Sequence, residues 1–354
     1  LAALENSELT YEKKHELNIG VALGFVDNRI NVEFDWYRRN NFDLIGYTQT
    51  MGVGGVTTKL ANDATMESTG CEFTISTTNI KTKDFKWTTD WIFGWAENTI
   101  TKLDSRSQVY SLVNGVGRTE GRPIGALYSI PFAGLTEEGL PTFFIDAEHT
   151  QVVGPGNYAD IYFQEYENID YLKYEGTIDP KITGSFGNTF SWKGLKLNVF
   201  FTYSFGNVLR LDNLCPVYSS DYSDLTASMK EMKNRWMVPG DENVTTIPSI
   251  PTVRQMREID ALNNAYSAYN YSTERVAKGD FIRLKELSLA YDLPKKYFEG
   301  QNAVSSFGVK LSATNLWLAY ADKKLNGRDP EYYNTGGVSS PVPRQFTLTV
   351  KLGF

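Results

Sequence analysis

The last thirteen residues, 342–354, alternate between a largely apolar face and a largely polar face. A period of two is the repeat of a β-strand that has one apolar and one wet face. The segment is about twice as long as a usual soluble strand, and it exceeds the roughly 9–11 tilted residues that cross a bilayer in a barrel. It therefore predicts a transmembrane strand. The apolar face consists of Val342, Arg344, Phe346, Leu348, Val350, Leu352 and Phe354.

The same alternation recurs in eight further segments, which gives nine expected strands. Several carry aromatic rings, and residue 354 itself is aromatic; such rings sit at the headgroup level of membrane proteins. The pattern predicts an all-β fold, a transmembrane antiparallel up-and-down β-barrel. The eight segments are 17–25, 30–37, 71–79, 85–95, 182–192, 195–205, 287–293 and 307–319.

The links between these strands alternate in length along the chain. Membrane barrels have short periplasmic turns and long extracellular loops. We therefore expect one domain, residues 1–354, with all long links outside the cell. The short links fall at 26–29, 81–84, 192–194 and 294–305, and the long ones at about 47–63, 98–180, 211–279 and 321–341.

Composition and termini exclude several other classes of protein. No apolar stretch approaches the ~18 residues of a membrane-spanning helix. The 42 acidic residues outnumber the 35 basic ones, and no basic run is present, so we expect no nucleic acid partner. Cys71 and Cys215 do not suggest a disulfide framework. Residues 1–8 do not resemble a signal peptide, and bacterial single-chain barrels have an even number of strands, so we expect this chain to be part of a longer protein.

The sequence contains no pattern typical of a catalytic or cofactor site. The two histidines, His15 and His149, lie far apart, and the glycines at 52, 54 and 55 precede no helix. We expect no enzyme activity, no cofactor and no metal. Four loop acids are interpreted as solvated charge, with calcium binding as the alternative: Asp221, Asp224, Asp241 and Glu242.

From residue 279 onward the sequence resembles the carboxy-terminal part of the SusC/RagA family of TonB-dependent outer-membrane transporters of Bacteroidetes. The matching segments are GDFIRLKELSLAYDLP (279–294), SATNLW (312–317), GRDPE (327–331) and PVPRQFTLTVKLGF (341–354). Weaker similarity extends over most of the chain, at 9–24, 28–37, 120–135 and 234–239.

This resemblance implies a 22-stranded barrel, of which the chain would form about strands 14 to 22. It also implies an amino-terminal plug and a TonB box, neither of which is in this chain, and a SusD-like surface lipoprotein that covers the extracellular loops. The implied function is import of oligosaccharides or, in some members, oligopeptides; we expect oligosaccharides. A passive porin and a secreted β-rich binding module remain alternatives.

Three groups of residues are candidates for binding. Tyrosines of the long loops are candidate substrate contacts, because rings stack on sugars or hold peptide side chains. An apolar stripe at helical spacing after Asp224 predicts a short amphipathic helix, which packs on the barrel or contacts the lipoprotein. Phe354 is a candidate signal for the barrel-assembly machinery, or the last lipid-facing residue. The tyrosines are Tyr158, Tyr162, Tyr218, Tyr222, Tyr266, Tyr269 and Tyr271, and the stripe is Leu225, Met229, Met232 and Trp236.

Overall fold

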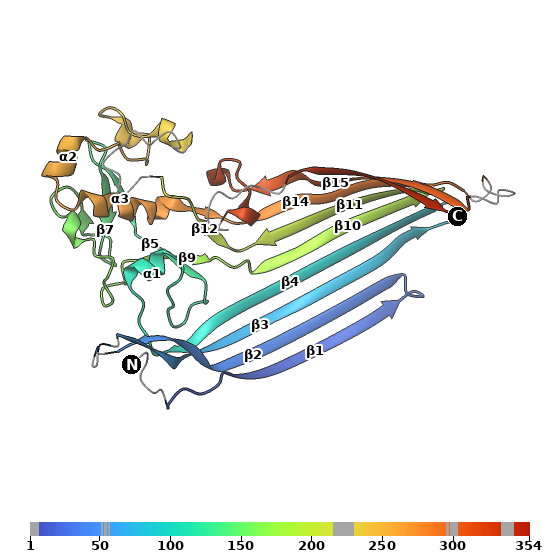
Figure 1. Ribbon diagram of the computed structural model, residues 1–354, viewed down its shortest axis with the longest axis horizontal. Helices are drawn as coiled ribbons and strands as arrows, with labels where there is room; N and C mark the ends of the chain where they lie inside the picture. Colours follow the sequence, from blue (N-terminus) through green and yellow to red (C-terminus); the bar gives the residue numbers. More distant parts are fainter. Residues whose placement is uncertain are drawn as a thin grey trace.

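The computed structural model describes residues 7–50, 52, 55, 57–214, 230–294, 297, 304–333 and 343–354. Nine long strands form one antiparallel sheet in the order in which they occur along the chain (Figure 1). All nine strands expected from the sequence are present. They are β1 (Lys13–Phe25), β2 (Ile30–Gln49), β3 (Thr58–Lys81), β4 (Phe85–Leu103), β10 (Ile182–Trp192), β11 (Leu195–Phe205), β14 (Phe281–Asp292), β15 (Ser306–Ala321) and β16 (Gln345–Gly353).

Several strands run further than the alternation indicated. β2 has 20 residues and β3 has 24, about twice what a bilayer requires. The expected loop at 47–63 is therefore wrong in its bounds, because strand pairing continues from Tyr47 opposite Leu60 to Gln49 opposite Thr58. Outside a bilayer both faces of a strand meet water, so the alternation fades while the backbone ladder continues.

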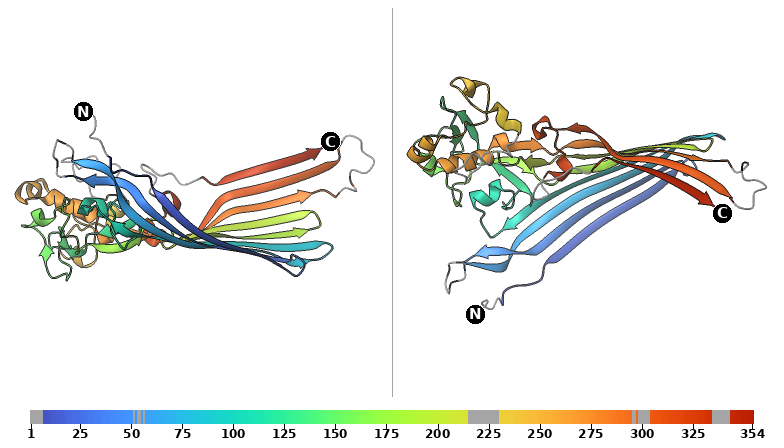
Figure 2. Two further views of the ribbon diagram at one scale, coloured as in Figure 1. Left: turned by 90° about the horizontal axis from the view of Figure 1, so that it is seen from below. Right: turned by 45° about the horizontal axis from the view of Figure 1, so that its top comes forward.

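Side chains of the sheet separate onto an apolar face and a polar face. Cross-strand neighbours share a face, so one row of paired residues shows the character of each. The sheet is curved rather than flat (Figure 2). An apolar row runs through Trp87, Phe190, Leu197, Leu289, Leu311 and Leu348; a polar row runs through Thr78, Thr88, Thr189, Asn198, Ser288, Ser312 and Thr347.

The two ends of the sheet differ. The turn end carries the links at 26–29, 82–84 and 193–194, and β16 finishes there (Figure 1). The loop end carries a compact body, here called the loop body, formed by the described residues of 104–181 and 206–280. This segregation agrees with the alternation of link lengths in the sequence.

The loop body contains short helices and strands around its own core. Its paired strands are β5 (Ala126–Ser129) with β9 (Lys173–Thr177), β6 (Phe132–Leu135) with β7 (Pro141–Phe144) and β8 (Val152–Val153), and β12 (Val208–Arg210) with β13 (Val276–Lys278). Its helices are α1 (Val109–Val113), α2 (Val253–Glu258) and α3 (Leu262–Asn270), with 3-10 turns η2 (Tyr158–Asp160), η4 (Lys230–Asn234), η5 (Asp241–Asn243) and η6 (Thr273–Arg275). Beyond β15 lie two further turns, η8 (Lys323–Leu325) and η9 (Pro330–Tyr332). Within the described part of the chain, no helix has both the length and the apolar character needed to span a membrane.

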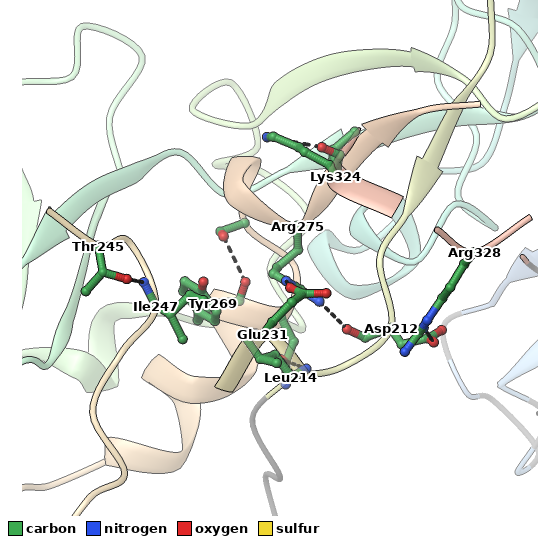
Figure 3. A network of polar contacts seen from close by, with 12 residues as sticks. Asp212, Leu214, Glu231, Thr245, Ile247, Tyr269, Arg275, Lys324 and Arg328 are labelled. Carbon is green, nitrogen blue, oxygen red and sulfur yellow. Dashed lines mark hydrogen bonds and ion pairs between the residues drawn. The ribbon is translucent and has the colours of Figure 1, made fainter. Parts of the chain in front are cut away.

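Two arginines, Arg210 and Arg275, hold the segments of the loop body together. Arg210, just beyond β11, donates hydrogen bonds to the carbonyl oxygens of Ser272, Val113 and Tyr128 at 2.9, 3.1 and 2.5 Å. Arg275 is buried, pairs with Glu231 at 2.6 Å and donates to the carbonyl oxygen of Asp212 (Figure 3). Charged hydrogen bonds of this kind are stronger than neutral ones. The segments 104–181 and 206–280 of the loop body are thereby joined to each other.

Candidate substrate-facing site at the loop end

A groove of about 770 Å³ lies where the loop ends of β2 and β3 meet the start of the loop body. The two strands supply residues 45–48 and 58–63, and the loop body supplies residues 104–118. Because β2 and β3 extend beyond the length needed for a bilayer, the groove lies outside the membrane at the mouth of the sheet.

Asp63 organises the floor of this groove. Its buried carboxylate accepts hydrogen bonds from the hydroxyls of Ser105 and Thr48, at 2.7 and 3.2 Å. The backbone N–H of Asp104 donates to the carbonyl oxygen of Asp63 at 2.9 Å. A Cβ on Gly46 would lie 3.3 Å from Asp63 and 3.4 Å from the guanidinium of Arg118, so Gly46 lets these side chains lie close to the strand. The floor is thus ordered before any ligand binds.

The walls of the groove present one exposed ring and several polar groups. The Tyr47 side chain is 75% exposed, which leaves its faces open for stacking. Arg106 and Arg118 supply donors, Asp104 supplies an acceptor, and Gln108 bonds to the hydroxyl of Tyr166. An open aromatic ring beside hydrogen-bond donors and acceptors suits a neutral ligand that makes several hydrogen bonds.

A second, smaller hollow of about 280 Å³ lies near the loop end of β2, β3 and β4. Arg39 stands 4.1 Å over the ring of Tyr37 and pairs with Glu16 at 2.9 Å. Lys181 pairs with Glu97 at 2.5 Å on its other side. Tyr37, Arg39 and Glu16 belong to the polar face, so this hollow extends the polar lining of the mouth into the sheet.

Three of the seven candidate tyrosines are buried in the core of the loop body. Tyr158 donates to the carbonyl oxygen of Pro141 at 2.8 Å, and burial raises the pKa of its hydroxyl. Tyr266 donates to the carbonyl oxygen of Ser249 at 2.7 Å, and Tyr269 packs edge-on against Phe132 at 5.7 Å. These side chains order the loops and have no face open to a substrate.

The other four tyrosines differ in accessibility. Tyr162 is exposed, whereas Tyr271 is partly buried against Tyr110 and Phe163, at ring distances of 6.0 and 6.1 Å. Tyr218 and Tyr222 lie outside the described residues. Of the seven, Tyr162 is the described residue with an open ring.

The apolar stripe is described only in its second half. Residues 230–234 form the 3-10 turn η4 rather than an α-helix, and Met232 is buried in the core of the loop body. The Trp236 ring packs on Gly139, and its indole N–H donates to Glu242 at 3.0 Å. Both residues therefore point into the loop body and not toward a partner. Leu225 and Met229 lie outside the described residues.

The acidic residues near this turn have structural partners. Asp241 accepts from the backbone N–H groups of Met237 and Val238, at 2.9 and 3.0 Å. Hydrogen bonds from its own backbone N–H, from the indole of Trp236 and from the backbone N–H of Gly240 lower the pKa of the Glu242 carboxyl. Among the described residues no cluster of three potential metal ligands is present. Asp221 and Asp224 are not described.

Sequence reasoning missed the residues of the groove. Tyr47 and Asp63 fell in an expected loop, because the polar run at 38–41 interrupts the alternation of β2. One signal was present: Ile45 and Tyr47 resume a period of two after that run. Arg106 and Arg118 reach the groove only through the fold of the loop body, for which the sequence offers no period.

Comparisons with known proteins agree with the fold. TonB-dependent receptor P3 of Formosa agariphila is 27% identical over all of this chain, which spans 35% of that receptor. TonB-dependent receptor SusC of Bacteroides thetaiotaomicron is 34% identical over 99 residues, 28% of this chain and 10% of SusC. The solved RagAB peptide transporter superposes with a TM-score of 0.75 at 25% identity, over 99% of this chain and 36% of that one. No family model matches. The chain thus spans about a third of the length of the relatives that it matches end to end.

Proposed function

Because this chain is part of the outer-membrane barrel of a SusC/RagA-type TonB-dependent receptor, we propose that it forms part of the barrel wall and part of the extracellular mouth of an importer powered through TonB. A transporter family also agrees with the expectation that the chain catalyses no reaction. The nine-stranded sheet encloses one side of the pathway, and the groove with Tyr47 lies at its entrance. Energy coupling requires segments outside residues 1–354, so this chain alone is expected to transport nothing.

The proposed substrate is an oligosaccharide. The observation that supports it is the groove, which sets an open tyrosine ring beside guanidinium, amide and carboxylate groups. Sugar rings offer an apolar face for stacking and hydroxyls that both donate and accept hydrogen bonds. Tyr162 is a second proposed contact on the exposed surface of the loop body.

An oligopeptide is the second candidate, favoured by the similarity of nearly the whole chain to a solved structure titled as a peptide transporter. Native mass spectrometry of the full-length protein, extracted gently with its partners, separates the two. Hexose-ladder masses among the released ligands would support a glycan, whereas a mixture of short peptides would replace it with a peptide. The same experiment tests the proposed SusD-like lipoprotein, whose absence would contradict that partner.

Replacing Tyr47 with alanine in the full-length protein is expected to weaken substrate binding about five- to tenfold, the loss of one stacking contact worth roughly 1 kcal/mol. Calorimetry with the released ligand measures the dissociation constant. Tyr11→Ala is the matched control, because Tyr11 is 77% exposed against 75% for Tyr47 but does not line the groove. Equal affinities for both variants would remove the groove from the proposed pathway.

Phe354 is proposed as an assembly signal. It follows β16, and its side chain is 90% exposed, so it is open to recognition as well as to lipid. Deleting Phe354 is expected to lower the outer-membrane level of the full-length protein several-fold without affecting its synthesis. Quantitative immunoblots of separated membranes measure this. Phe346→Ala, which removes another exposed ring of β16, is the control for loss of lipid contact; unchanged levels after the deletion would contradict the proposal.

A further inference from the structure

A small group of polar side chains interrupts the apolar face of the sheet near its turn end. Thr89 of β4 lies opposite Thr77 of β3 and, on its other side, opposite Asn188 of β10. The register between β3 and β4 shifts at Asn79, so this residue is the extra one of a β-bulge, and its side chain bonds to Thr89. Thr77, Asn79, Thr89 and Asn188 are here called the polar cluster.

Apolar side chains surround the polar cluster on the same face of the sheet. They occupy the next positions of that face along β4 and β10 and the positions beside the cluster on β2 and β11. The polar cluster therefore faces lipid and not the inside of the barrel. In lipid a polar side chain is costly unless its donors and acceptors are satisfied. The surrounding residues are Trp87, Phe190, Trp91, Phe186, Ile30 and Val199.

Hydrogen bonds within the polar cluster run in one direction and end at Asn188. The hydroxyl of Thr77 donates to Oδ1 of Asn79 at 2.8 Å, and Nδ2 of Asn79 donates to the hydroxyl of Thr89 at 2.7 Å. The Thr89 hydroxyl donates to Oδ1 of Asn188 at 2.7 Å. The same oxygen accepts from the indole N–H of Trp87 at 2.9 Å. Because hydrogen bonds in a chain polarise one another, the cluster is held as one unit.

The side-chain nitrogen of Asn188 has no partner among the described residues. An indole N–H can only donate, so the amide atom beside Trp87 is the oxygen, and the nitrogen points elsewhere. Asn188 is partly exposed on the apolar face. Its two amide N–H donors are thus open to the bilayer, where water is scarce. A lipid group that accepts hydrogen bonds would satisfy them.

The depth of Asn188 in the membrane indicates which part of a lipid meets it. Aromatic rings gather at the turn end: Trp87 stacks on Phe190 with ring centroids 5.6 Å apart, and Trp192 is 54% exposed. Such rings lie at the level of the lipid headgroups. Asn188 is two residues farther from the turn than Phe190, or about 5 Å deeper for a strand tilted by about 40°. The interfacial layer is about 5–8 Å thick, so the lipid group at this depth is the ester carbonyl.

We propose that the polar cluster binds one glycerophospholipid, whose ester carbonyl oxygen accepts a hydrogen bond from the side-chain amide of Asn188. Short turns mark the periplasmic end of a membrane barrel, which assigns this lipid to the periplasmic leaflet. An ester carbonyl accepts hydrogen bonds and donates none, so it fits an open amide group that presents donors only. The inference rests on the membrane barrel and is independent of the proposed import and of its substrate.

Ester and ether lipids with the same headgroup test this contact. Native mass spectrometry of the delipidated full-length protein measures the dissociation constants of dioleoyl phosphatidylethanolamine and of its diether analogue. The analogue keeps the headgroup and chains but lacks both carbonyl oxygens. We expect one tightly bound diester lipid per barrel, held about fivefold more tightly than the diether, which corresponds to one hydrogen bond. Equal affinities of the unaltered protein for both lipids would overturn the inference.

Replacing Asn188 with leucine removes the amide donors. Asn188→Leu is expected to bind the diester about fivefold more weakly and to lose the distinction between the two lipids. Asn198→Leu is the matched control, expected to keep that distinction, because Asn198 is the same residue type on the neighbouring strand but lies on the polar face. Gel mobility without boiling shows whether each variant folds, and the two-lipid comparison on the unaltered protein decides the proposal if one does not.

Two other results would also overturn the inference. One is an Asn188→Leu protein that still prefers the diester. The other is native masses in which the variant loses a second copy of the receptor instead of a lipid, since the open amide would then bind protein. Uptake is not the readout, so a protein that prefers the diester but does not transport would contradict the proposed function alone.

Discussion

Replacing Arg210 with methionine is expected to loosen the loop body, because this side chain joins its two segments, 104–181 and 206–280. The side chain donates to three carbonyl oxygens, of Ser272, Val113 and Tyr128, and methionine can satisfy none of them. Burial lowers the pKa of Arg210 to about 10, so the guanidinium still carries its charge at neutral pH. Losing these charged hydrogen bonds is expected to cost the local folding of the loop body about 2–5 kcal/mol.

Limited proteolysis of the detergent-solubilised full-length protein measures this effect. Cleavage within residues 104–280 is expected to accelerate by more than about tenfold, since every 1.4 kcal/mol of local stability changes the open population tenfold. Arg254→Met is the matched control, because Arg254 also lies in the loop body but is 81% exposed and pairs only with Glu258. Equal cleavage of both variants would show that Arg210 does not hold the two segments of the loop body together. Substrate binding should fall with Arg210→Met, because the carbonyl of Val113 belongs to the segment that forms one wall of the groove.

Replacing Gly184 with alanine is expected to prevent correct folding of the central strands. A Cβ at this position would lie 2.2 Å from the carbonyl oxygen of Ile92 and 2.4 Å from the hydroxyl of Tyr203. The ring of Tyr203 lies over Gly184 and reaches across β10, accepting from the indole of Trp91 and donating to Ile92, both at 2.9 Å. The extra methyl must displace either the backbone or this ring, at a cost of about 1–3 kcal/mol or more.

The heat-modified mobility of the full-length protein on unboiled gels reports whether the barrel forms. For Gly184→Ala the folded band is expected to decrease strongly and the melting temperature of the remainder to fall. Gly94→Ala is the control, because a Cβ on Gly94, which lies on the neighbouring strand β4, meets no atom closer than 3.6 Å. If the Gly184→Ala protein were as stable as the Gly94→Ala protein, the ring of Tyr203 would move aside without a cost in stability, which would contradict the prediction.

The strands and the ends of the sheet could be predicted from the sequence because a bilayer imposes a strict contrast. Within it one face of each strand meets lipid and the other meets polar surroundings, so β10 and β11 were predicted with the bounds that the structure shows. Above the bilayer that contrast is absent. The loop-end residues of β2 and β3, 47–49 and 58–63, were therefore taken for a loop, although their hydrogen-bonded ladder continues.

The candidate site could not be predicted from the sequence, for a different reason. Tyr47, Tyr158 and Tyr162 are the same residue type in polar surroundings, yet the structure exposes the first and third and buries the second. Only the packing of the loop body decides which ring stays open, and that packing depends on contacts between distant segments, such as those of Arg210. The sequence by itself determined the nine strands, their order and the two ends of the sheet, because periodicity is a local property of the chain. The groove and the packing of Tyr203 over Gly184 were decided by the tertiary structure, because each requires residues far apart in sequence to meet.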